Sequence, residues 1–379
     1  MRIAFHTPLN LFDDDGVSGD RRMARQLVAA LRSLGHEVEP VPAPRFYLRS
    51  ADPAELAGLQ ATARTLCADL TAHWRHRSAP DLWFTYHHYY RAPDLLGPTL
   101  SAGFGIPYVT AEASDAPRRA EGEWAPHTQL VRSALAAGDA HIYFTERDRQ
   151  GLEPWRRPGT ALIKLPPFVA FDTAPPEAGR TQRQPLRLVT IAMMRAGTKQ
   201  NSYLALARIL DRIRHLDWRL SVIGDGSGRA TIEPAFAGLP PGRVSWLGLL
   251  PRERALAELA GHDLFVWPGL REAYGLVYLE AQAVGLPVVA FDSGGVADVV
   301  AQGETALLVP EGDEAAFADA LEALLRDPDR RERMGRAARR FAMAERSPAR
   351  AADNLAEVLA VAVANRRAKM APDEGKRLS

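Results

Sequence analysis

The sequence predicts an α/β protein with two doubly wound, Rossmann-like parallel-sheet domains that face a cleft. The chain has 379 residues, which is long for one domain. Short apolar runs without alternation recur in both halves, as is typical of parallel strands covered on both faces. Residues 166–185 are rich in proline and lack periodicity, which favours a linker there. We therefore place an N-terminal domain at residues 1–170 and a C-terminal domain at 185–345.

The first half opens with a strand, loop, helix and strand, which is the repeating unit of a parallel sheet. The two strands are predicted at residues 2–8 and 37–41. The helix between them is predicted by apolar residues at helical spacing, which are Met23, Leu27, Ala30 and Leu31. Gly35 is typical of a residue that ends a helix. Further buried strands are predicted at 81–90, 107–114 and 140–145.

The second half repeats the alternation of strands and helices. Its strands are predicted at 186–194, 219–226, 244–248, 263–269, 286–291 and 305–310. Its helices include 203–213, 314–326 and 329–345. A last helix at about 349–365 could pack back on the first domain. The end of the chain, 366–379, is polar, and we expect a flexible tail.

Composition narrows the class of protein. The chain has 47 basic and 46 acidic residues and a net charge of +1, which gives no reason to expect nucleic-acid binding. Cys67 is the single cysteine, so no intrachain disulfide is possible and a reducing compartment is favoured. We see no signal peptide and no run of about 20 apolar residues, so we expect a cytoplasmic protein. Trp74, with Arg75 and Arg77, leaves a weak peripheral membrane contact open.

The stretch "REAYGLVYLEAQAVGLPVVAF", residues 271–291, carries the clearest chemical pattern. A loop holding Glu272 precedes Gly275, and a helix is predicted to begin at about Leu276 with Glu280 on its first or second turn. A helix N-terminus offers unpaired amide groups and a partial positive charge, which together bind phosphate. Gly275 would let a phosphate approach the backbone closely. The spacing alone leaves a second interpretation open, in which both glutamates are ordinary solvated charges at a helix start.

The same stretch, continued to Val300, resembles the signature of family-four retaining glycosyltransferases of the GT-B fold. It has two glutamates separated by seven residues, a glycine before a helix, a Gly-x-Pro-Val-Val strand and a Gly-Gly turn. Three further stretches occur in the family's order, namely "VIGDGSGRATIE", the 26 residues from Val244 and the 33 residues from Gly303. The resemblance covers residues 186–345, and "SGDRRMARQLVAALRSLGHEV" extends it more weakly into the first half.

The resemblance implies transfer of a sugar from a nucleotide sugar to an acceptor, with retained anomeric configuration and without a metal or other cofactor. It implies that Glu272 binds the donor sugar and Glu280 the ribose, and that Arg195 and Lys199 face the diphosphate. These cations would stabilise charge that grows on the leaving group. The family's usual Gly-Arg and Lys-Gly pattern is altered here to "AMMRAGTKQ". The remaining implied donor-binding residues are Gly19, Gly224, Gly226, Tyr274, Gly275, Leu276 and Val277.

The acceptor side departs from the family. Many members carry a histidine where this chain has Glu112, and His87 ends the preceding predicted strand. We expect His87 and Glu112 to line the acceptor pocket. The acceptor could be a glycan, a lipid, a metabolite or a peptide, and the donor base could be uridine or guanosine. Two alternatives stay open, a nucleotide-sugar epimerase of the same fold and a catalytically silent nucleotide-binding scaffold. Asp13, Asp14 and Asp15 are expected to form an exposed turn rather than a metal motif.

Overall fold

The structure is a computed structural model that describes residues 1–12, 18–179 and 184–371, so Asp13, Asp14 and Asp15 lie outside the described residues. The chain divides into two compact units. Unit 1 contains Met1–Pro166 together with Pro348–Ser379, and unit 2 contains Pro167–Ser347. Each unit holds one six-stranded sheet in which every pairing is parallel. This is the α/β class that the sequence predicts.

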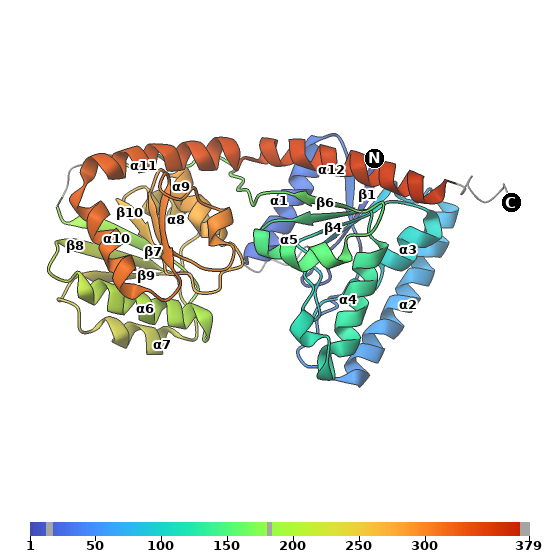
Figure 1. Ribbon diagram of the computed structural model, residues 1–379, viewed down its shortest axis with the longest axis horizontal. Coiled ribbons are helices and arrows are strands. Elements are labelled where there is room, and N and C mark those ends of the chain that lie inside the picture. The colour runs from blue at the N-terminus through green and yellow to red at the C-terminus, as the bar shows by residue number, and fades with distance from the viewer. Residues whose placement is uncertain (13–17, 180–183, 372–379) are drawn as a thin grey trace. The chain divides into compact units, whose positions relative to one another are not determined.

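The sheet of unit 1 has the strand order β2-β1-β3-β4-β5-β6. Its strands are β1 (Arg2–His6), β2 (Glu37–Pro40), β3 (Leu82–Tyr86), β4 (Tyr108–Ala111), β5 (Ala140–Tyr143) and β6 (Ala161–Lys164). The central strands β3 and β4 are buried along their whole length, because helices cover both faces of the sheet (Figure 1). This explains their continuous apolar runs, which lack the alternation of a half-exposed strand.

The described residues of unit 1 form six α-helices. They are α1 (Gly19–Ser33), α2 (Pro53–His76), α3 (Gly97–Phe104), α4 (Ala125–Ala137), α5 (Glu146–Leu152) and α12 (Pro348–Met370). Ser18 caps α1 by accepting a hydrogen bond from the amide of Arg21, and Asp52 caps α2 in the same way through Ala54. Short 3-10 turns lie at Pro117–Arg119, Gly122–Trp124 and Glu153–Trp155.

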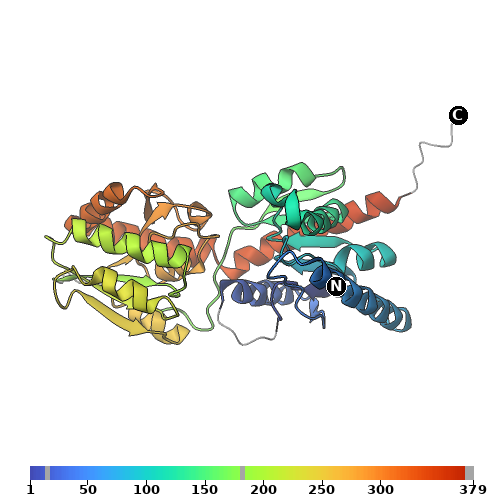
Figure 2. The ribbon, with the colours of Figure 1, turned by 90° about the horizontal axis from the view of Figure 1, so that it is seen from below.

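Helix α12 joins unit 1 although it follows unit 2 in the sequence. It packs against α1 and against the sheet edge at β5 and β6, and it runs alongside unit 1 in both views (Figures 1 and 2). Its last turns are anchored at Asp139, which forms ion pairs with Arg366 at 2.7 Å and Lys369 at 3.0 Å. The predicted start of the tail at residue 366 is therefore too early, because these two cations bind a buried carboxylate and continue the helix to Met370.

Trp74 does not support the weak membrane contact that the sequence leaves open. Trp74 is 8% exposed and packs edge-on against Trp83 and Phe104, with ring centroids at 6.2 and 5.3 Å. An indole held in the core cannot reach a lipid surface. Within the described residues, we find no helix of the length and apolarity needed to cross a bilayer.

The sheet of unit 2 has the order β12-β11-β10-β7-β8-β9. Its strands are β7 (Leu186–Ile191), β8 (Trp218–Ile223), β9 (Val244–Gly248), β10 (Leu264–Val266), β11 (Val288–Asp292) and β12 (Ala306–Pro310). Its helices are α6 (Thr198–Arg212), α7 (Arg229–Ile232), α8 (Arg252–Leu259), α9 (Leu276–Ala283), α10 (Glu314–Arg326) and α11 (Pro328–Arg340), followed by a π-helical turn at Phe341–Glu345. Two 3-10 turns lie at Glu233–Phe236 and Val296–Asp298. In Figure 1, α6 and α7 lie on one face of this sheet, and α8, α9 and α11 lie on the other.

The strand order fixes where a ligand can bind in each unit. In unit 2 the first strand, β7, lies between β8 and β10. The chain adds β8 and β9 on one side of β7 and then crosses back to add β10 on the other side. In unit 1 the corresponding strand is β1, which lies between β2 and β3. Open α/β sheets bind ligands beyond the carboxyl ends of strands at such a switch point. The loops after β7 and β10, and those after β1 and β3, are therefore the places to examine.

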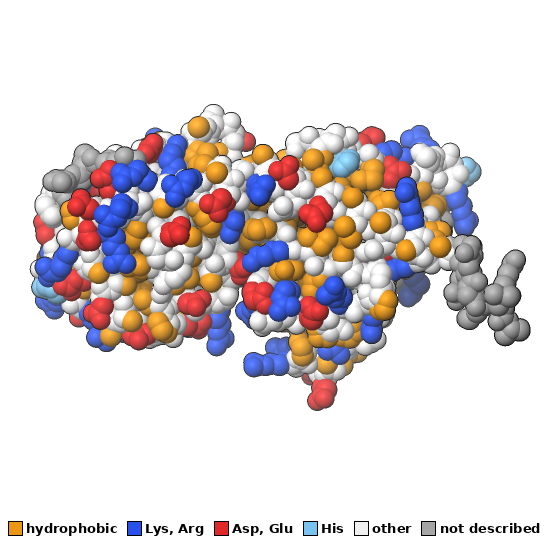
Figure 3. Space-filling view, turned by 45° about the horizontal axis from the view of Figure 1, so that its top comes forward, with side chains coloured by type: hydrophobic (Ala, Val, Ile, Leu, Met, Phe, Trp, Pro, Cys, Tyr) orange, Lys and Arg blue, Asp and Glu red, His pale blue; other side chains and the backbone are white. Residues whose placement is uncertain are grey.

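Charged side chains of both signs lie on the face of the molecule that Figure 3 shows. Figure 3 shows basic and acidic side chains interspersed on the face in view, without a large region of one sign. This distribution accords with the nearly balanced charge of the sequence. Charge of this kind gives no electrostatic footprint for a nucleic acid.

Candidate active site in unit 2

The backbone after β10 forms a candidate anion-binding site at the start of α9. Gly275 is the N-cap of this helix, with φ of 80°, and a Cβ there would lie 2.8 Å from the ring of Tyr278. Glycine is therefore required on two grounds, since positive φ is strained for other residues. The amides of Leu276 and Val277 precede the first intrahelical hydrogen bond, so the helix itself supplies them no acceptor. The helix begins where the sequence predicts.

Glu272 lies in the loop before this helix, and Lys199 contacts it. The Nζ of Lys199, on the first turn of α6, donates to Oε1 of Glu272. The indole Nε1 of Trp267 donates to the same oxygen at 3.0 Å. Lys199 Nζ also lies 5.6 Å from the centre of the Trp267 ring, within the range of a cation–π contact. The residues that the sequence separates by 73 positions thus form one charged pair at the switch point.

The loop that carries Glu272 is held by close backbone contacts. The amide of Glu272 donates to the carbonyl of Gly269 at 3.2 Å, and its carbonyl accepts from the amide of Gly295 at 3.1 Å. Gly294 packs against that same carbonyl, since a Cβ at Gly294 would lie 1.8 Å from the oxygen. The Gly-Gly turn of the sequence motif therefore has a steric purpose, which is to let two backbone segments meet behind the Glu272 side chain.

Helix α6 is fixed to the same loop by two further contacts. Ser202 Oγ accepts from the amide of Leu270 at 3.0 Å. Tyr203 packs edge-on against Trp267 with ring centroids 4.7 Å apart, and its hydroxyl donates to the carbonyl of Ala192 at 2.7 Å. Tyr203 and Trp267 are both fully buried. These side chains position Lys199 and Glu272, and the sequence prediction missed them because their chemistry is that of ordinary core residues.

Glu280 has its own cationic partner. Arg252, on the first turn of α8, donates from Nε to Oε1 of Glu280 at 3.2 Å. The guanidinium also donates to the carbonyl of Ala170 and lies 4.9 Å from the ring centre of Phe171. Glu280 is 14% exposed at the side chain, so it is not the solvated helix residue of the second interpretation. The sequence prediction missed Arg252, which stands 28 positions from Glu280 in no recognisable motif.

Gly224 and Gly226 shape the turn after β8. Their φ angles are 137° and 151°, and Cβ atoms at these positions would lie 2.0 Å from Ala192 O and 2.4 Å from Met194 O. The turn therefore packs backbone against backbone on the segment that follows β7. That segment leads to Arg195, whose side chain is exposed. In the part of the chain that the structure describes, no ion pair joins Arg195 to Glu272.

Tyr274, predicted at the donor site, is buried at 5% exposure. Gly19, predicted to approach the donor phosphates, is the first residue of α1 in unit 1. A Cβ at Gly19 would meet nothing within 4 Å, so no contact within the described protein requires glycine there. The predicted roles of these two residues in donor binding stay predictions.

A second group of titratable residues lies at the switch point of unit 1. His87 follows β3, Glu112 follows β4, and Asp20 is on the first turn of α1. The Nδ1 of His87 lies 3.4 Å from Oδ1 of Asp20, and the hydroxyl of Tyr86 donates to Oε2 of Glu112 at 2.8 Å. The structure thus brings the two predicted acceptor residues, His87 and Glu112, to one place. It adds Asp20, which the sequence prediction missed because Asp20 reads equally well as a helix-capping residue.

The electrostatics of this group are unusual. Burial lowers the pKa of His87, but the carboxylates of Glu112 and Asp20 outweigh it, and the pKa is raised to about 9. Burial raises the pKa of Glu112 to about 7, against the opposing effect of His87. Both residues also adopt positive φ, 58° for His87 and 52° for Glu112. Such backbone conformations are costly for non-glycine residues and tend to cluster at functional sites.

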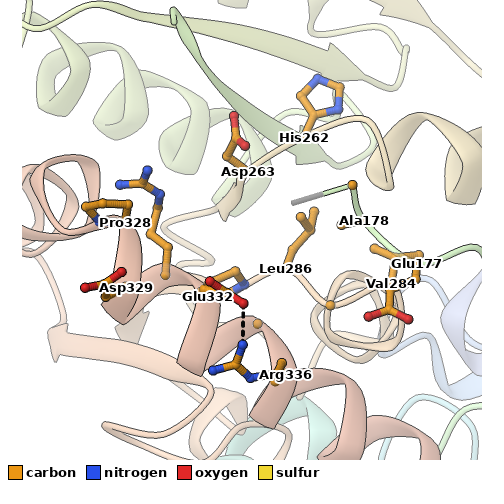
Figure 4. A pocket seen from close by; sticks show the side chains of 15 residues that line it. Glu177, Ala178, His262, Asp263, Val284, Leu286, Pro328, Asp329, Glu332 and Arg336 are labelled. Carbon is orange, nitrogen blue, oxygen red and sulfur yellow. Dashed lines mark hydrogen bonds and ion pairs between the residues drawn. The ribbon is translucent and has the colours of Figure 1, made fainter. Parts of the chain in front are cut away.

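Unit 2 has another hollow, shown in Figure 4, at the opposite edge of its sheet. Asp263 and Leu286, which line it, precede the starts of β10 and β11. Acidic and basic side chains surround it, including the ion pair of Glu332 and Arg336 (Figure 4). Because this hollow lies at the amino ends of the strands, it is separate from the candidate anion-binding site at the start of α9.

Residues 186–341 match the family described as glycosyl transferases group 1. This stretch is therefore the part of the chain that is similar to group 1 glycosyl transferases. The match spans β7 to α11 and contains Lys199, Glu272, Gly275 and Glu280. A D-inositol 3-phosphate glycosyltransferase of Corynebacterium efficiens is 38% identical over 136 residues, which cover 35% of this chain and 32% of that protein. The chain spans between a third and a half of the length of the first curated relatives that it matches.

Solved structures resemble the fold of nearly the whole chain and not only residues 186–341. Sucrose-phosphate synthase from Thermosynechococcus elongatus superposes with a TM-score of 0.71 at 19% identity, over 94% of this chain and 97% of that one. Anabaena HepE, solved in complex with UDP, gives a TM-score of 0.67 at 15% identity, over 95% of this chain and 100% of that one. Both units of the chain are therefore parts of a GT-B fold.

Proposed function

We propose that the chain is a retaining glycosyltransferase that moves a sugar from a UDP- or GDP-sugar to a hydroxyl acceptor. The proposal rests above all on one observation, the Lys199–Glu272 pair beside the N-terminus of α9 at the switch point of unit 2. The match to the group 1 family and the presence of UDP in the HepE structure support it. A reducing compartment, the cytoplasm, remains our expectation from the single cysteine.

The donor diphosphate would bind the amides of Leu276 and Val277, where the helix dipole favours negative charge. Lys199 and Arg195 would stabilise the charge that develops on the leaving diphosphate. Glu272 would accept hydrogen bonds from the sugar hydroxyls, and Glu280 from a ribose hydroxyl. All of these residues belong to unit 2, which would therefore supply most of the donor contacts, with Gly19 of unit 1 as the further predicted one.

The transfer itself would proceed on the front face of the sugar. The acceptor hydroxyl attacks the anomeric carbon from the side on which the nucleotide leaves, and the bond from that carbon to the diphosphate oxygen breaks. A donor phosphate oxygen takes the acceptor proton. This step asks for positioning and charge stabilisation rather than for a strong base, and the donor residues named above supply both without a metal.

A thermal-shift panel of UDP, GDP and their sugars tests the proposal directly. A ligand that binds only the folded protein at about 100 times its Kd adds about 2.7 kcal/mol of stability. We expect one nucleotide class to raise the melting temperature of the parent. The same nucleotides should hardly change the melting temperature of the Lys199→Ala variant. Failure of every nucleotide to stabilise the parent would refute the proposal. Conversion of the donor sugar without acceptor would instead identify an epimerase, and binding without any conversion a silent scaffold.

Glu280 is expected to act on donor affinity rather than on the chemical step. A hydrogen bond to a charged group contributes about 1.5–3 kcal/mol, so Glu280→Gln should raise KM for the nucleotide sugar by roughly 10- to 100-fold with little change in kcat. Glu314→Gln is the matched control, because Glu314 pairs with Arg208 across two helices of the same unit. Steady-state kinetics of both variants decide the matter. An equal KM for the two variants would remove Glu280 from the donor site.

A further inference from the structure

We infer that Asp20, His87 and Glu112 of unit 1 form a binding site for a divalent transition-metal cation such as Mn²⁺ or Zn²⁺. One donor atom from each of these residues lies within 4.8 Å of the other two. The donor set is one imidazole nitrogen and two carboxylate oxygens, a combination that suits these ions. The inference concerns unit 1 alone and stands whether or not the proposed sugar transfer is correct.

The fold places these three residues where a ligand site is expected. Asp20 is on the helix that follows β1, His87 follows β3, and Glu112 follows β4. Strands β1 and β3 flank the switch point of the sheet. The backbone fixes the two strand-end residues, since the amide of His87 donates to the carbonyl of Ala111 at 2.8 Å and that of Glu112 to Ile142 at 3.0 Å. The donor atoms are therefore held by rigid elements rather than by mobile loops.

Two further observations point to a bound cation. The Nδ1 atom of His87 is buried, and no hydrogen bond to it is recorded among the described residues. It faces Asp20 at 3.4 Å, which is a distance between neighbouring ligands of one ion rather than a hydrogen bond. Asp20 and His87 also line one small hollow together with Arg21 and Tyr86.

The charge balance favours a cation over an anion or a neutral group. Three carboxylates act on His87, namely Glu112, Asp20 and, more weakly, Asp148 of α5. These carboxylates attract a divalent cation and repel an anion. Tyr86 donates to Glu112 at 2.8 Å, as hydrogen-bonding partners around metal ligands commonly do.

Binding releases a proton, which gives the site a pH signature. A histidine must be neutral to coordinate a metal, so the ion replaces the proton of the His87 imidazolium, and that proton leaves to solvent. Affinity for the metal should therefore rise with pH until the imidazole is fully deprotonated, by up to about tenfold per pH unit for one proton released.

The test is calorimetric titration of the metal-free full chain with Mn²⁺ or Zn²⁺ alone, together with Co²⁺ absorption as a probe of ligand geometry. We expect one site per chain in the parent. Asp20→Asn and Glu112→Gln should weaken binding by about 100-fold or more, and Tyr86→Phe by about 10-fold, as for other partners of metal ligands. His87→Asn removes the imidazole while retaining a residue that tolerates positive φ. Glu146→Gln, at an exposed carboxylate of the same unit, is the control and should bind like the parent.

Thermal unfolding of each variant shows whether it has kept its fold. The inference is overturned if the folded parent binds no metal up to millimolar concentration. It is equally overturned if Asp20→Asn and Glu112→Gln bind as tightly as the parent, because the metal would then lie elsewhere. Stabilisation by an amine ligand in place of any metal would show that the site holds an ammonium group, and would also overturn it.

Discussion

Glu272→Gln is expected to lower kcat for sugar transfer by about 10²–10³-fold, the cost of removing one preorganised charge-stabilising group. Glu272 shares one carboxylate oxygen between Lys199 and the indole of Trp267. The amide of glutamine keeps an oxygen for these donors but removes the negative charge that orients the lysine. The side chain is 13% exposed, so water cannot readily take over this role. Steady-state kinetics with saturating acceptor measures the effect.

A double-mutant cycle with Lys199→Met separates the pair from its parts. If the two side chains act as one unit, the double variant should be about as slow as the worse single variant, because contacting catalytic groups are strongly non-additive. Nucleotide binding and melting temperature serve as folding controls. Unchanged kcat in Glu272→Gln, or fully additive losses across the cycle, would show that the pair is structural and plays no part in transfer.

Gly294→Ala is expected to displace the loop that carries Glu272. The φ angle of Gly294 is 63°, and the added Cβ would lie 1.8 Å from the carbonyl oxygen of Glu272. A contact this short forces the Glu272 loop to move, and it adds to the cost of about 1–2 kcal/mol for a left-handed alanine. We expect a loss of several kcal/mol in the stability of unit 2. Transfer should fall at least as far as in Glu272→Gln.

Gly303→Ala is the matched control for this substitution. Gly303 also has positive φ, 81°, but a Cβ there meets nothing within 4 Å. It should lose only the backbone term of about 1–2 kcal/mol, a shift of about 2–8 °C in melting temperature, and keep its activity. Differential scanning calorimetry and transfer assays compare the two variants. Equal losses of stability and activity in both would mean that φ strain, and not the contact with Glu272, explains the need for glycine.

At the two switch points, the sequence predicts the local backbone features but not the partners that come from distant parts of the chain. The sequence places Glu272, Gly275 and Glu280 around a helix start, and the structure confirms that start at Leu276. The sequence predicts this helix start because a glycine before a helix and the apolar pattern after it are local features. The cationic partners of the two glutamates are distant in the sequence and leave no local pattern. The family resemblance predicts Lys199, and no sequence feature points to Arg252.

The same division holds in unit 1. His87 and Glu112 were placed at strand ends, since each follows an apolar run that a parallel strand requires. Their closeness to each other and to Asp20 follows from the strand order β1-β3-β4 and its register. No local pattern encodes that order. The return of α12 to unit 1 belongs here too, because Asp139 and Arg366 meet across 227 positions of sequence.

The sequence by itself determined the α/β class, most of the strands, some of the helices, and the glycine-started helix with its two acidic residues. These depend on interactions between residues near one another in the chain, which leave a periodic trace. Only the tertiary structure decided which cation meets which carboxylate, which core rings support them, and that Asp20 joins His87 and Glu112. Those distances are set by strand order and by packing between distant segments, and side-chain type alone carries no record of either.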